Sequence, residues 1–87
     1  RDPAGGVVPL IRQLNAQADE WRATELARAR KRLAKGEDIE TVLEALSRGL
    51  TQKMLHGAMA ELHGASPDGR ANTTQAIKRM FLRGSSR

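Results

Sequence analysis

The sequence contains no cysteine and has few aromatic residues. Without cysteine, its 87 residues can form no disulfide, thiolate metal site or cysteine nucleophile. The aromatic residues are Trp21 and Phe81, so there is little on which RNA bases could stack. No apolar run approaches the roughly 20 residues that a membrane-spanning helix needs. A chain without cysteine fits a reducing compartment, and we expect a cytoplasmic protein.

The two ends of the chain are expected to be irregular. A proline and a glycine pair disfavour regular structure in residues 1–7, which we expect to be a flexible lead-in. There is no signal-peptide core and no initiator methionine, so we expect an excised piece of a longer protein. Residues 84–87 are expected to form a disordered tail. This leaves residues 8–83 as one helical domain.

The pattern between the two ends is helical. Alanine, leucine and arginine are plentiful, and apolar residues recur at spacings of three and four. We predict an all-α domain of about three helices. The first covers residues 8–35, and the second runs from 39 towards 62, either bent or broken at 47–49 because of a glycine there. The last begins near Asn72 or Thr73, either of which could cap it.

The sharpest boundary lies between the first two helices. Gly36 can adopt the left-handed conformation that ends a helix. Asp38 follows at once, and its carboxylate can accept hydrogen bonds from the first free amides of a second helix.

The first helix is too long for the domain that contains it. About 28 residues span about 42 Å, whereas a compact chain of this length is only about 30 Å across. Part of its apolar stripe must therefore be covered by a second copy or by an adjoining domain of the parent protein. We predict a dimeric helical bundle. The candidate interface or core residues are Leu14, Ala18, Trp21, Leu26, Leu33, Leu43, Leu46, Leu50, Leu55 and Met59.

Several segments of the chain resemble one known family. The run Leu50–His56 reads Leu-Thr-Gln-Lys-Met-Leu-His, and it is similar to the Leu-Thr-Asn-Lys-Leu-Leu-His of the C-terminal dimerisation domain of glutamyl-tRNA reductase. The segments Val7–Arg12 and Leu33–Asp38 resemble its proline-containing helix entry and its glycine-acid turn. Ile77–Leu82 is similar to its Arg-Arg-Leu-Phe tail. One departure is that the family often has a proline just after the histidine, where this chain has Gly57-Ala58.

The resemblance implies a parent enzyme that uses NADPH to reduce glutamyl-tRNA to glutamate-1-semialdehyde in tetrapyrrole (porphyrin) biosynthesis. Such a parent carries its cysteine nucleophile and its NADPH domain elsewhere. This chain has no cysteine and no Gly-x-Gly-x-x-Gly fingerprint. We therefore expect a non-catalytic homodimerisation domain that holds no cofactor. Its expected partners are a second copy, the catalytic and NADPH domains, and, through the parent, glutamyl-tRNA.

A basic cluster supports an alternative function. Closely spaced cations can bind phosphate, so the chain could be a basic helical module that contacts the tRNA backbone. A solvated basic helix face is the simpler interpretation. An autonomous enzyme is disfavoured, because no catalytic triad, carboxylate pair or phosphate loop can be assembled. The cluster consists of Arg28, Arg30, Lys31, Arg32 and Lys35.

Two histidines and a lysine complete the set of candidate sites. His56 and His63 are seven residues apart and would share a helix face, but two ligands are too few for zinc. We therefore expect no metal site, with His56 packed near the core and His63 exposed. Lys53 could bridge two subunits, or its aliphatic stem could pass apolar neighbours to reach water.

Overall fold

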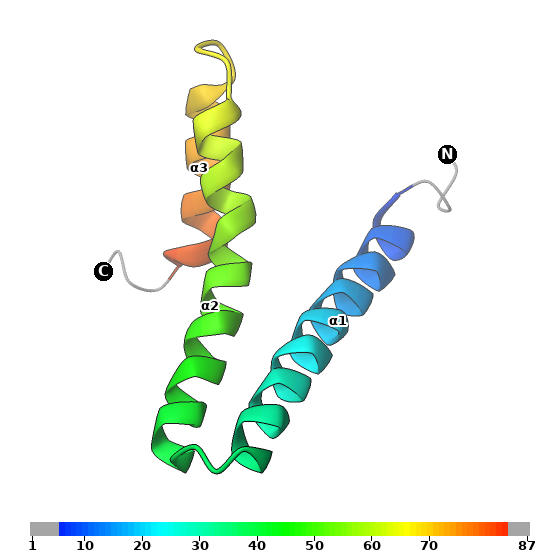
Figure 1. Cartoon of the computed structure of the whole chain (residues 1–87). Helices are drawn as coiled ribbons and strands as arrows, with labels where there is room; N and C mark the ends of the chain where they lie inside the picture. Colours follow the sequence, from blue (N-terminus) through cyan, green and yellow to red (C-terminus); the bar gives the residue numbers. More distant parts are fainter. Residues whose placement is uncertain (1–5, 84–87) are drawn as a thin grey trace. The chain divides into compact units, whose positions relative to one another are not determined.

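A computed structural model describes residues 6–83, and three α-helices account for most of them (Figure 1). In chain order these are α1 (Val7–Ala34), α2 (Ile39–Gly64) and α3 (Arg70–Phe81). There is no strand within 6–83, so the all-α prediction is confirmed. No helix in this range is long and apolar enough to cross a membrane.

Two compact units divide the chain, Arg1–Thr51 and Gln52–Arg87, and α2 contributes to both. The first unit therefore contains α1 and the first part of α2, and the second contains the rest of α2 with α3. The predicted tail and all but the end of the predicted lead-in lie outside the described residues. Val7, assigned to the lead-in, is the first residue of α1.

The turn between α1 and α2 follows the predicted local rules. Gly36 has a φ of 91°, the left-handed conformation that glycine adopts without strain. The Gly36 amide donates a hydrogen bond to the Leu33 carbonyl at 2.9 Å. The Glu37 amide donates one to the Arg32 carbonyl at 3.2 Å. These two bonds form a Schellman motif, which satisfies the last carbonyls of α1. The Asp38 carboxylate accepts from the Thr41 amide at 3.2 Å, so the predicted cap is confirmed.

The second helix runs without interruption through the glycine-containing segment. Of the two alternatives left open, a bent helix or a broken one, the broken helix is therefore wrong. The hydroxyls of Ser47 and Thr51 donate to the carbonyls of Glu44 and Ser47, at 3.0 and 2.9 Å. Both side chains thus bond back to the preceding turn of their own helix.

The start of α3 differs from the prediction. Gly69 occupies the N-cap position and makes no side-chain cap bond, so the expectation that Asn72 or Thr73 caps the helix is wrong. The Gly69 amide instead closes a turn onto Ser66, whose carbonyl oxygen lies 3.1 Å away. The amide of Thr73 then donates to the Gly69 carbonyl at 3.0 Å. This turn places the first helical residue at Arg70, ahead of both cap candidates.

Very few apolar side chains are buried by the chain itself. Among the described residues the buried apolar ones are Ala29 and Val42, which are 8% and 1% exposed. Burying a valine contributes about 2 kcal/mol, comparable to the entropy lost on ordering one or two backbone residues. A single copy therefore lacks the core that normally supports a domain of this length.

We expect the α1–α2 turn to be sensitive to substitution. Gly36→Ala should lower the free energy of unfolding by about 1–2 kcal/mol, because alanine is strained at positive φ. Asp38→Ala should lower it by about 1 kcal/mol through loss of the cap. Chemical unfolding followed by circular dichroism, at one fixed protein concentration, measures both effects.

Gly57→Ala provides the control. A Cβ at position 57 meets nothing within 4 Å, so alanine there should raise the stability by about 0.5–1 kcal/mol. Equal effects of alanine at positions 36 and 57 would contradict the assignment of the left-handed turn.

Candidate functional site: an exposed apolar surface

The ten candidate interface residues all remain accessible in one copy of the chain. None is fully buried, so each has surface available to a partner. The exposed members are Leu14, Ala18, Leu33, Leu43, Leu55 and Met59, and the half-buried members are Trp21, Leu26, Leu46 and Leu50.

Further large apolar residues are exposed in one copy of the chain but are not among the ten candidates. Their exposed fractions range from 39% to 68%. Of those on α1, Val7 and Ile11 recur at the same spacing as the candidates, a signal that is present in the sequence. These additional residues are Val7, Val8, Leu10, Ile11, Ile39, Met54, Met80, Phe81 and Leu82.

The first half of α1 carries a regular apolar stripe. It consists of Val7, Ile11, Leu14, Ala18 and Trp21, which alternate steps of four and three residues. This is the spacing of a seam that packs against another helix. Leu14 is 60% exposed and Ile11 is 50% exposed, so the α1 stripe is uncovered in one copy.

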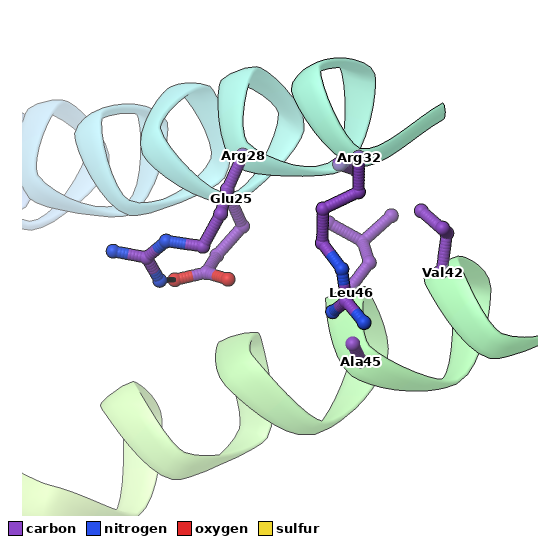
Figure 2. Close-up of a pocket in the computed structure, with 7 residues that line it drawn as sticks. Glu25, Arg28, Arg32, Val42, Ala45 and Leu46 are labelled. Atoms are coloured by element: carbon purple, nitrogen blue, oxygen red, sulfur yellow. Dashed lines mark hydrogen bonds and ion pairs between the residues drawn. The ribbon is translucent and has the colours of Figure 1, made fainter. Parts of the chain in front are cut away.

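The last third of α1 is covered by the start of α2. Figure 2 shows the two helices facing each other. A small cavity of about 20 Å³ is lined by residues of both. Such a cavity has room for little more than one water molecule, so it is no site for an organic ligand. The residues around it are Glu25, Arg28, Ala29, Arg32, Val42, Ala45 and Leu46.

The second unit has an exposed apolar surface of its own. Met54, Leu55 and Met59 on α2 are 55%, 37% and 50% exposed. Met80 and Phe81, at the end of α3, are 65% and 39% exposed. All three methionines of the chain thus lie on this surface. Methionine side chains adapt their shape to a partner, which suits an interface.

Two members of the predicted basic cluster are paired with acids. Arg28 lies 2.9 Å from Glu25, and Arg32 lies 2.7 Å from Glu37. The hydrogen bond from Arg32 holds the pKa of the Glu37 carboxyl below its ordinary value. The other three members, Arg30, Lys31 and Lys35, are exposed, and the tRNA contact stays a prediction.

The predicted histidine pair forms no metal cluster with other residues. His56 and His63 are both exposed on α2, so the expectation that His56 packs near the core is wrong for one copy. Residues 6–83 contain no group of three or more potential metal ligands. Lys53, also on α2, is half-buried.

The fold and its uncovered apolar surface define a helical interaction module. Residues 4–83 match the family described as "Glutamyl-tRNAGlu reductase, dimerisation domain", and the chain belongs to that family. This confirms the resemblance to the dimerisation domain and the predicted role, without placing the domain within the parent.

Relatives with the name glutamyl-tRNA reductase are closely similar. The protein of Acidovorax sp. (strain JS42) is 72% identical over 90 residues, which cover 100% of this chain and 21% of the relative. That of Albidiferax ferrireducens is 70% identical over 78 residues, which cover 90% of this chain and 19% of the relative. The chain thus spans about a fifth of the length of these relatives. No solved structure matches it.

We expect the ion pair between Arg32 and Glu37 to make stability depend on pH. Because folding lowers the pKa of Glu37, the pair stabilises the fold above the unfolded-state value of 4.5. That contribution should disappear as the pH falls through the folded-state pKa. Denaturant unfolding of the wild type and of Glu37→Gln at a series of acidic pH values isolates the contribution of the ion pair. Parallel pH profiles for the two proteins would contradict this assignment.

Proposed function

We propose that this domain joins two copies of a parent glutamyl-tRNA reductase by burying its exposed apolar helix faces between them. The uncovered α1 stripe carries this proposal. It extends over five apolar positions from Val7 to Trp21, with the regular spacing of a helix–helix contact.

A second copy is the occupant that best accounts for the exposed surface. The family is described as a dimerisation domain, and a two-fold pair presents the same apolar faces to each other. The exposed residues of the second unit, which include Leu55 and Met59, would extend the contact. The ten candidate residues are therefore proposed as interface residues, with the four half-buried ones serving both the chain and the contact.

The relatives' name and the resemblance of the sequence supply the rest of the proposal. The parent would reduce glutamyl-tRNA with NADPH to glutamate-1-semialdehyde in tetrapyrrole biosynthesis, and this domain would lie at its C-terminal end. A cytoplasmic location would fit the lack of cysteine in the sequence. A dinucleotide site of the strand–turn–helix type does not fit residues 6–83, which contain no strand. NADPH and the reacting groups would therefore belong to other domains.

Light scattering over a range of protein concentrations tests the proposed dimer. The wild-type protein should have a mass in solution twice that of the 9.5 kDa monomer. Leu14→Asp should weaken the dimer by at least about 100-fold, because two-fold symmetry places the charge in the contact twice. Since Leu14 is 60% exposed in one copy, the substitution removes no contact within the core of the chain.

Ala16→Asp is the matched control. It introduces the same charge on an exposed position of α1, two residues from Leu14 and so on the far side of the helix from the stripe. It should leave the dimer intact. A wild-type monomer at every concentration, or equal losses for the two variants, would contradict the proposed use of the α1 stripe.

A further inference from the structure

Glu25 is the buried charged side chain of the described residues, and the interface does not account for it. It lies on α1 and is only 3% exposed. Arg28, one turn further along, places Nη1 2.9 Å from Oε2 of Glu25, although the Arg28 side chain itself is 61% exposed. The Glu25 carboxylate is therefore buried within the first unit. The Arg28 guanidinium, which is largely exposed, pairs with it from the solvent side.

Gly49 on α2 provides the space for this carboxylate. A Cβ at position 49 would lie 2.8 Å from Cδ of Glu25, closer than carbon atoms can approach without a shift. Gly49 is not among the positive-φ residues, so its backbone does not require glycine. In Figure 2, Glu25 projects from α1 towards α2 beside the Arg28 guanidinium. Glycine at position 49 thus leaves the space that the Glu25 side chain occupies.

The position of Glu25 along α1 links this contact to dimerisation. The α1 stripe ends at Trp21, and the next step of four residues reaches Glu25. Ala29, four residues further, is buried beneath α2. Glu25 therefore marks the point where the apolar side of α1 passes from uncovered to covered by α2.

We propose that Glu25, seated against Gly49 and held by Arg28, is a positioning residue that fixes how α1 packs on the first part of α2. It thereby sets the direction in which the α1 stripe is presented to the second copy. The proposal rests on the proposed function. Its physical basis is that a buried carboxylate is tolerated only where its partners are in place, whereas contacts between small apolar side chains allow sliding. A single buried polar residue sets helix register in coiled coils in the same way.

Gly49→Ala is the direct test. The added methyl group should push the Glu25 carboxylate away and shift α1 on α2. We expect the melting temperature to fall by about 4–8 °C and the dimer to weaken by at least about tenfold. Gly57→Ala is the matched control, since it adds the same methyl group to the same helix where nothing lies within 4 Å. Position 57 is three residues from Met54 and so lies near the exposed surface of the second unit. This variant is therefore a control for the melting temperature alone, which it should not lower.

Adding Glu25→Asp to Gly49→Ala tests whether the dimer is restored, which separates a positioning role from a general loss of stability. Aspartate is one methylene shorter and should make room for the new methyl group. The double variant Glu25→Asp/Gly49→Ala should therefore dimerise within about threefold of Glu25→Asp alone. If Gly49→Ala melts and dimerises like the wild type, or if the double variant dimerises no better than Gly49→Ala, the proposal is overturned.

Glu25→Gln keeps the test decisive if Gly49→Ala does not fold. Glutamine preserves the volume and removes the charge, so the dimer should weaken while the helix content stays unchanged. An unchanged dimer would overturn the role of the charge. A wild-type chain that stays monomeric overturns the proposed function and the dimerisation role of Glu25 together. By contrast, an intact wild-type dimer with an insensitive Gly49→Ala overturns the positioning role alone.

Discussion

The shortage of buried apolar surface in a single copy is the constraint on which the rest of this structure depends. Ala29 and Val42 are the buried apolar residues of the described chain, while many larger apolar side chains are exposed. The helices therefore present their apolar faces outward instead of packing them around a core of their own. Only a partner that covers these faces could supply the missing burial. The exposed faces thus require a partner, and the family of this chain is described as a dimerisation domain.

Features that depend on near neighbours in the sequence could be predicted from it. Gly36 predicts a helix end through its backbone freedom, and Asp38 predicts a helix start through its side-chain cap. The structure confirms both predictions. The predicted start of α3 is wrong because a preference for capping residues competed with a tight turn just before them. Asn72 and Thr73 are good caps, but the turn closed by Ser66 and Gly69 comes first and begins the helix at once.

The division between covered and uncovered residues could not be predicted in the same way. Further apolar residues follow Trp21 on α1, and their spacing does not tell which of them α2 covers. Glu25 was not identified because charged residues usually lie on the surface, and its burial depends on a glycine 24 positions later on another helix. Which of the ten candidates meet a second copy likewise depends on contacts that no local pattern encodes.

The α1–α2 turn has a consequence for the order in which the molecule assembles. Its Schellman bonds and its aspartate cap join residues at most five positions apart, so they form within one chain on the timescale of helix formation. Association needs a second molecule, and its rate falls as the protein is diluted. A newly made chain should thus acquire its helical hairpin first and wait for a partner, with its apolar faces open to capture by a chaperone in the interval.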